Sequence, residues 1–224
     1  MKIVVSVGGS VLARALSPEK FRNYAAALKD ISRNNVVFIV TGGGKAARDY
    51  IGVARDLGAD EATCDLIGIE LTRLNARLLI AALGDDAYYE PPRDYKEAKN
   101  ASLSGKMVVM GGVTPGQTTD AVSAVLAEYI GAELLINATA IDGVYTSDPK
   151  KNRDAKKFDS MTPHQLIEIV MKTEMVAGAN SPVDLLAAKI IERSNIKTIV
   201  LNGEDPQSIV EAVSGKHKGT VIGK

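Results

Sequence analysis

The chain has 224 residues, a formal net charge of zero, 46% hydrophobic and 24% charged side chains, and one cysteine, Cys64. This length fits a single domain that can bury a sizeable core. The balanced charge disfavours nucleic acid or an anionic membrane as a partner. A lone cysteine cannot form an internal disulfide, which suits the cytoplasm, where we expect the protein to act.

The first sixty residues show the order strand, glycine loop and helix twice. The apolar run 3–7 stops at Gly8-Gly9-Ser10, and a helix is predicted from Ser17-Pro18 to about residue 33. A second buried strand, 36–40, stops at Thr41-Gly42-Gly43-Gly44, before a helix over 45–57. Repeats of this kind predict right-handed crossovers and a parallel sheet, with the glycine loops at the carboxyl ends of the strands.

A long helix is predicted over 60–82. We expect its main apolar stripe to consist of Ile67, Leu71, Leu74 and Leu78, with Asp65 and Arg73 elsewhere on the helix surface. A second apolar edge leaves two readings open, because either core burial or a contact between subunits explains it. A short strand over 87–90 and a short helix over 95–101 are expected to follow.

The segment 107–120, MVVMGGVTPGQTTD, is the third unit of this kind. A buried strand, 107–110, ends at Gly111-Gly112, and Thr118-Thr119-Asp120 opens an alanine-rich helix over 121–130. A glycine loop before a helix N-terminus binds anions, because free backbone N–H groups and the helix dipole point to one place. The position of Asp120 after two threonines also suits an ordinary helix cap.

The remainder of the chain continues the α/β pattern. Strands are predicted at 134–138 and 197–201, and an edge strand at 220–222. Residues 146–159 are so polar that composition alone favours a solvated loop. Three helix starts combine a cap with proline: Thr162-Pro163, Ser181-Pro182 and Asp205-Pro206.

The loops favour phosphate chemistry. Lys45 and Arg48 follow three glycines in the first turn of a helix, where cations oppose the helix dipole unless an anion lies in front. The chain contains no Walker motif, dinucleotide fingerprint or protein-kinase motif. Phosphoryl transfer by positioning fits this loop set, with Asp120, Asp142 and Asp148 as the nearest acids. From these residues alone, the prediction is an α/β phosphate-binding enzyme of the kinase class.

Taken together, the motifs resemble the amino acid kinase superfamily, and within it the archaeal-type uridylate (UMP) kinases. The resemblance covers nearly the whole chain: VSVGGSVL, TGGGKAARDYI, CDLIGIELTRLNA, VVMGGVTPGQTTDAVSAVLAE, DGVYTSDPK, VDLLAAKII and IKTIVLNG. It implies a three-layer αβα sandwich around a largely parallel sheet. It also implies transfer of the ATP γ-phosphate to UMP with Mg²⁺, giving UDP, by a homohexamer built as a trimer of dimers.

The resemblance also implies a division of labour within one domain, 1–224, whose first part serves mainly UMP and whose part from about 135 serves mainly ATP. The ATP side would comprise Gly9, Ser10, Gly44, Arg48, Thr139, Tyr145 and Asp148. The UMP side would comprise Gly43, Asp65, Val113, Thr114, Pro115, Gly116, Gln117, Thr118 and Thr119. Asp120 would organise the phosphate donors, and the polar stretch after Tyr145 would be part of an ATP-side flap.

Two departures from the superfamily pattern argue against the kinases of this family that form acyl phosphates. Ser6 and Pro182 stand where related amino-acid kinases carry lysines that neutralise an acyl-phosphate transition state. Lys45, Arg48 and Mg²⁺ held by the ATP phosphates are the candidates to neutralise charge here. Isopentenyl phosphate kinases carry a histidine in the corresponding glycine region. GGGKAARDY has none, which argues against that activity as well. The alternatives to UMP kinase are another small-molecule kinase of this fold and a non-catalytic nucleotide-binding regulator.

Overall fold

The computed structural model describes residues 1–14, 16–149, 151–174 and 183–223. One seven-stranded sheet runs through these residues in the order β3-β2-β1-β4-β6-β7-β5, and only β6 and β7 pair antiparallel. The strands are β1 (Lys2–Val7), β2 (Val36–Thr41), β3 (Val108–Met110), β4 (Leu134–Thr139), β5 (Ser160–Met161), β6 (Thr198–Asn202) and β7 (Thr220–Ile222).

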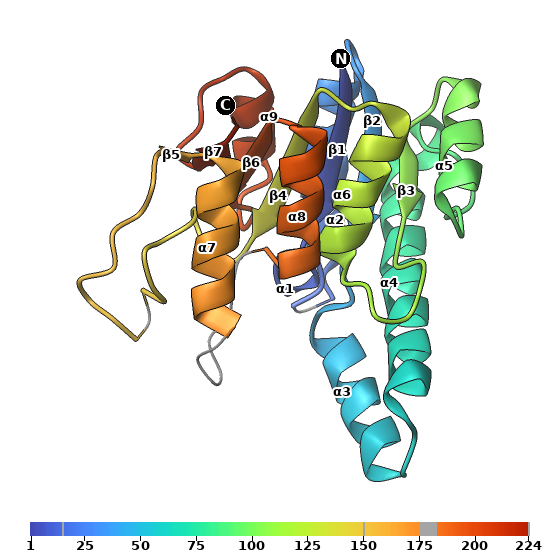
Figure 1. Cartoon of the computed structure of the whole chain (residues 1–224). Coiled ribbons are helices and arrows are strands. Elements are labelled where there is room, and N and C mark those ends of the chain that lie inside the picture. Colours follow the sequence, from blue (N-terminus) through green and yellow to red (C-terminus); the bar gives the residue numbers. More distant parts are fainter. Residues whose placement is uncertain (15, 150, 175–182, 224) are drawn as a thin grey trace.

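Helices cover both faces of this sheet, which confirms the predicted three-layer αβα fold (Figure 1). One layer contains α5 (Tyr95–Ala101), α6 (Thr119–Ile130), α7 (Pro163–Glu174) and α8 (Leu185–Ser194). The other contains α2 (Pro18–Ser32), α4 (Glu61–Leu83) and α9 (Gln207–Val213). The short α1 (Gly9–Leu12) follows β1 directly, and α3 (Gly44–Asp56) projects with the start of α4 beyond the sheet (Figure 1).

Side chains of the central strands alternate between two cores, as the pleat of a strand requires. On β2, Phe38 and Val40 pack with α6 on one face, whereas Val37 and Ile39 pack with α2 and α4 on the other. Because both faces are covered, the strands are continuous apolar runs, as is typical of a parallel sheet.

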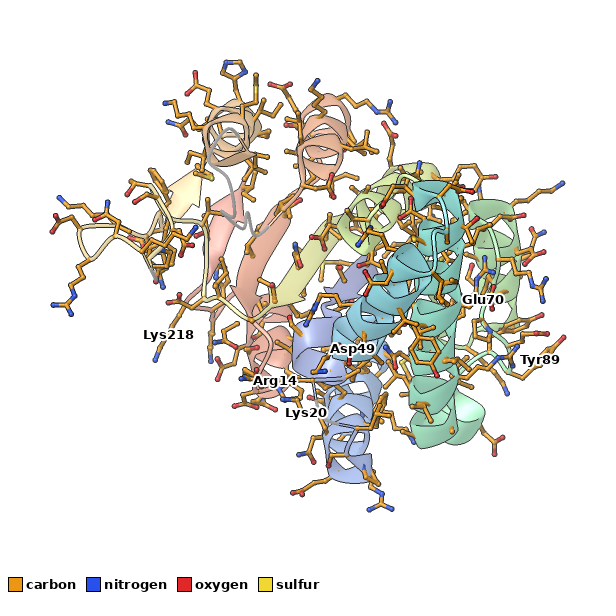
Figure 2. The ribbon with its side chains drawn as sticks, turned by 90° about the horizontal axis from the view of Figure 1, so that it is seen from below. Arg14, Lys20, Asp49, Glu70, Tyr89 and Lys218 are labelled. Carbon is orange, nitrogen blue, oxygen red and sulfur yellow. The ribbon has the colours of Figure 1, made fainter. Side chains whose placement is uncertain are left out.

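Parallel pairing brings the carboxyl ends of β1, β2, β3, β4 and β6 to one edge of the sheet. In register, Val7 lies beside Thr41 on one side and Ala138 on the other. The three predicted glycine loops therefore meet at this edge. Figure 2 views the molecule from that side, with Arg14 and Asp49, which lie beyond the first two loops, near the middle.

The predicted apolar stripe of α4 was wrong. The buried face of the helix contains Gly68, Ile69, Thr72, Ala76 and Leu79. The predicted members Leu74 and Leu78 are 54% and 45% exposed. The core prefers small residues on α4 because the glycine loops and β3 approach it closely. A periodicity count that rewards large apolar side chains therefore selects a face offset by one residue, about 100°, from the buried one. Arg73, expected on the surface, has only 18% of its side chain exposed.

Three other local predictions also needed correction. The strand at 220–222 is not at the edge, because β7 lies between β6 and the unpredicted β5. The stretch 87–90 contributes only one bridge, from Ala87 to Met107. The helix start at Ser181-Pro182 lies outside the described residues, and the cap of α8 is Asp184.

In the part of the chain that the structure describes, no helix is long and apolar enough to cross a membrane.

Candidate active site

The first two glycine loops touch each other through their backbones. A Cβ placed on Gly9 would lie 2.0 Å from the nitrogen of Gly44, and one on Gly42 would lie 2.4 Å from the nitrogen of Gly9. Gly44 also has a φ of +69°, which disfavours a side chain. Both loops therefore need glycine in order to meet. Their meeting places Gly9, Ser10, Gly43 and Gly44 in one small region, as the sequence predicted.

The third glycine pair has a different structural reason. A Cβ on Gly111 would lie 2.4 Å from the Thr72 hydroxyl oxygen, and one on Gly112 would lie 2.9 Å from a carbon of Ile69. The Gly112 N–H donates to that hydroxyl over 2.7 Å. These glycines let β3 and the following loop lie directly against α4. Anion binding was the reason predicted for these glycines from the sequence, and close packing against α4 is a second, separate reason.

We call residues 113–118 the acceptor loop, after the role that is proposed for them below. Three side chains from different elements hold it. The Gly116 N–H donates to Asp65 of α4 over 2.7 Å. The Tyr95 hydroxyl of α5 donates to the Gln117 side-chain carbonyl over 3.0 Å. The Thr118 hydroxyl donates to Asp184, the N-cap of α8. The loop is thus shaped by its surroundings on three sides.

Asp120 lies at the N-terminus of α6, but the residue that caps this helix is Thr118. The Thr118 hydroxyl oxygen accepts from the Ala121 N–H over 3.1 Å. The cap reading of Asp120 was therefore wrong. The Asp120 carboxylate instead accepts from the Ser6 hydroxyl over 3.2 Å and from the Asn137 side chain. It lies above the junction of β1 and β4, at the centre of the sheet.

Burial and the nearby Asp184 carboxylate raise the pKa of Asp120 to about 7, despite the opposing hydrogen bonds from Ser6 and Asn137. Burial penalises the charged form, and a second carboxylate adds repulsion. The partner of this acid on β1 is the neutral hydroxyl of Ser6. A strongly shifted carboxyl at the converging loop ends is the electrostatic signature of a functional site.

The two predicted cations of α3 differ in their surroundings. The Lys45 ammonium pairs with Asp49 over 2.5 Å, and its side chain is 67% exposed. Arg48 is exposed, and within the described ranges no hydrogen bond or ion pair is recorded for its guanidinium. Arg48 is therefore the better placed of the two to meet an incoming phosphate, since its donors are not already committed.

The edge beside β4 is held by contacts that the sequence did not reveal. The Gly203 N–H donates to the Thr139 carbonyl over 2.8 Å. The fully buried Tyr24 of α2 donates its hydroxyl to the Gly203 carbonyl over 2.5 Å. This pair fixes the end of β6 against Thr139. No local pattern marks Tyr24, because its partner is 179 residues away.

The segment after β4, described over 140–149 and 151–159, is a largely exposed loop, here called the flap, that is held by contacts among its own residues. Tyr145 forms an antiparallel bridge with Lys157, and its hydroxyl donates to Asp142 over 2.7 Å. Lys157 also donates to Asp142, over 3.0 Å. The hydrogen bonds from Tyr145 and Lys157 both lower the pKa of the Asp142 carboxyl. Asp148 lies farther along the flap, where its carbonyl accepts from the Asn152 N–H over 2.9 Å.

The described residues contain no group of three or more histidine, cysteine, aspartate or glutamate side chains placed to hold a metal ion. The site therefore consists of backbone amides, one exposed arginine, a raised-pKa acid and a shaped acceptor loop. Those parts stabilise charge by position and need no nucleophilic side chain, which defines the class of small-molecule phosphotransferases.

Comparison with known proteins agrees with this class. The chain belongs to the amino acid kinase family, whose family model matches residues 1–202. The chain is 61% identical over 213 residues to a uridylate kinase of Methanococcoides burtonii, covering 95% of this chain and 91% of that protein. It is 54% identical over 224 residues to a uridylate kinase of Halobacterium salinarum, covering 99% and 93% respectively.

Solved structures give the same picture. The crystal structure of uridylate kinase from Archaeoglobus fulgidus superposes with a TM-score of 0.91 at 52% identity, covering 99% of this chain and all of the other. The UMP kinase of Ureaplasma parvum superposes with a TM-score of 0.84 at 25% identity, covering 100% and 98%. The fold is thus retained across a wide range of sequence identity.

The environment of Asp120 makes a prediction about stability. Its folded pKa lies above the usual value of 3.8, so between about pH 4 and pH 7 the native state keeps a proton that the unfolded chain loses. Raising the pH through this window therefore destabilises the fold. We expect Asp120→Asn to gain stability over the native protein as pH rises, by on the order of 4 kcal/mol at most above pH 7.

Urea denaturation at pH 4.5, 6 and 8 measures this difference. The control is Asp56→Asn, which removes an exposed carboxylate of α3 and should show no comparable trend. A constant difference between Asp120→Asn and the native protein at all three pH values would contradict the raised pKa.

Proposed function

We propose that the protein is a UMP kinase, which transfers the γ-phosphate of ATP to UMP and releases UDP and ADP. It would act in the cytoplasm, in pyrimidine nucleotide biosynthesis. The observation that carries the proposal is the position of the acceptor loop beside Asp120 and the paired glycine loops at one edge of the sheet. The names of relatives at 54–61% identity support the same activity.

The proposal divides the chain between the two nucleotides. The part before about residue 135 would serve mainly UMP: Asp65 would accept hydrogen bonds from the ribose, and Gly43 with residues 113–119 would surround the phosphate and uracil. The part after it would serve mainly ATP, with Thr139, Tyr145 and Asp148 at the nucleoside end. Gly9, Ser10, Gly44 and Arg48 would lie along the ATP phosphates, where the two loops touch.

The reaction needs no covalent intermediate on the protein. A phosphate oxygen of UMP attacks the γ-phosphorus, and the bond from that phosphorus to the β–γ bridging oxygen breaks, leaving its electrons on ADP. The protein contributes alignment of the two oxygens and stabilisation of the charge on the transferred group. Mg²⁺ would enter with the ATP phosphates.

Asp120 would organise donors and would not act as a base, because a UMP phosphate oxygen is already deprotonated at neutral pH. Its hydrogen bonds to Ser6 of β1 and Asn137 of β4 tie the start of α6 to the two central strands. A pKa near neutrality also reduces the repulsion that a fixed carboxylate would exert on two nearby phosphate groups.

A coupled assay of ADP release tests the activity. We expect turnover with ATP and UMP, and little with acetylglutamate or isopentenyl phosphate. Turnover of CMP, acetylglutamate or isopentenyl phosphate without UMP would identify another kinase of this fold. Binding of ATP and UMP in a thermal-shift experiment, without UDP formation, would identify a regulator. Asp120→Asn should keep its fold and lose most activity.

The two cations give a matched pair of variants. Arg48→Met should lower kcat/KM by about 10- to 100-fold, the range expected for a lost charged hydrogen bond. Lys45→Met should have a much smaller effect, because the Lys45 ammonium is exposed and paired with Asp49. Steady-state kinetics with both substrates varied separates the two. Equal losses in both variants would contradict the distinction between these side chains.

We also propose a homo-oligomer, and by family resemblance a hexamer built as a trimer of dimers. The exposed side of α4 contains Leu66, Leu74 and Leu78, which are 53%, 54% and 45% exposed. Apolar side chains spaced along one helix face mark a surface that another chain can cover. Light scattering should give a mass above 23.7 kDa, and Leu74→Glu with Leu78→Glu should reduce it. A monomeric native protein would exclude this arrangement.

A further inference from the structure

The acceptor loop has little internal support. Its one recorded internal backbone bond runs from the Gln117 N–H to the Thr114 carbonyl over 3.3 Å. Thr114, Gly116 and Thr118 are exposed, and Val113 packs at the margin of a core. The shape of the loop before a nucleotide enters therefore depends on Asp65, Tyr95 and Asp184.

Two of these three anchors use groups that the proposed function gives to UMP. Asp65 would also accept from the ribose. The single hydroxyl proton of Thr118 is donated to Asp184, so donation to a phosphate would break that anchor. The Tyr95 hydroxyl is different, because Tyr95 is not among the proposed ligand residues. Gln117 is among the proposed UMP residues, but the Tyr95 bond occupies only its side-chain carbonyl and leaves its side-chain N–H donors for the nucleotide, so this anchor can persist through nucleotide binding.

Tyr95 is itself held firmly. It begins α5, whose N-cap Asp94 accepts from the Glu97 N–H over 2.7 Å, and Ala98 of the same helix is fully buried. Its ring lies 6.5 Å from the ring of Tyr129, centroid to centroid. Burial raises the pKa of Tyr95 to about 12, so the hydroxyl keeps its proton and remains a donor at neutral pH.

We propose that Tyr95 is a positioning residue that fixes Gln117 and so presets the acceptor loop for the acceptor nucleotide. The inference rests on the proposed function, in which this loop receives UMP. Presetting lowers the cost of ordering a loop on binding. The benefit should therefore fall on acceptor affinity, while the chemical step and the ATP side, at β4 and the flap, are left unchanged.

Tyr95→Phe removes the hydroxyl and keeps the ring. We expect KM for UMP to rise about three- to tenfold, the factor for losing one neutral hydrogen bond. The kcat at saturating UMP and KM for ATP should stay within about twofold, since a loss of this kind affects binding alone. Tyr129→Phe is the matched control, because the Tyr129 ring contacts Tyr95 and no hydrogen bond of its hydroxyl to the acceptor loop is recorded among the described residues.

Amide hydrogen exchange of the nucleotide-free protein gives a readout that does not depend on activity. The amides of Gly116 and Gln117, which are hydrogen-bonded in this structure, should exchange faster in Tyr95→Phe than in the native protein or in Tyr129→Phe. In a Gln117→Met background, Tyr95→Phe should add no further increase, because the shared bond is already absent.

The outcomes separate this inference from the proposed function. Unchanged exchange and unchanged KM for UMP in Tyr95→Phe would overturn the positioning role, even in an active UMP kinase. A parallel rise in KM for ATP, or the same change in Tyr129→Phe, would overturn it as well, because the effect would then be general loosening. Faster exchange in a protein that does not phosphorylate UMP would uphold the positioning of the loop and reject the proposed activity.

Discussion

The site depends on the contact between Gly9 and Gly44. Two loops from adjacent parallel strands can touch through their backbones only if neither has side chains at the contact. A Cβ on Gly9 would lie 2.0 Å from the Gly44 nitrogen, which leaves no room for even alanine. The parallel register of β1 and β2 brings the loops to one level, and glycine lets them close. The backbones of the two loops thereby lie together at this edge of the sheet.

The electrostatics of the site follow from this arrangement. Backbone amides carry no net charge, so the loops can surround phosphate in a chain whose formal charge is zero. The fixed acid at the centre, Asp120, would oppose phosphate if fully ionised, but burial and Asp184 raise its pKa towards neutrality. The candidate positive charge is the exposed guanidinium of Arg48 on α3, and this helix projects beyond the sheet (Figure 1). Fixed parts of the site are thus close to neutral, and the cation lies on an outlying helix.

The stiffness of the site is unevenly distributed. Residues on the β4 and β6 side are tied down by a fully buried tyrosine, Tyr24, and a backbone bond between Gly203 and Thr139. The acceptor loop is tied by side chains at three exposed or half-buried points. A loop held this way can exchange one of these hydrogen bonds for a bond to a ligand and keep the other two. The β4 and β6 side therefore rests on a buried contact, whereas the loop 113–118 rests on contacts at or near the surface.

The α/β class with a parallel sheet, most element bounds and the three glycine loops could be predicted from the sequence, because strand–glycine–helix order is a local signal. Tertiary structure decided which face of α4 is buried. Small residues there match the close approach of Gly111 and Gly112, and no count of large apolar residues detects that. It also decided that Ser6 is a partner of Asp120, and the roles of Tyr24, Tyr95 and Asp184, since these contacts join residues 22 to 179 positions apart. Local pattern cannot specify such pairs; only the packing of β1, β4, α6 and α8 against one another brings them within hydrogen-bonding distance.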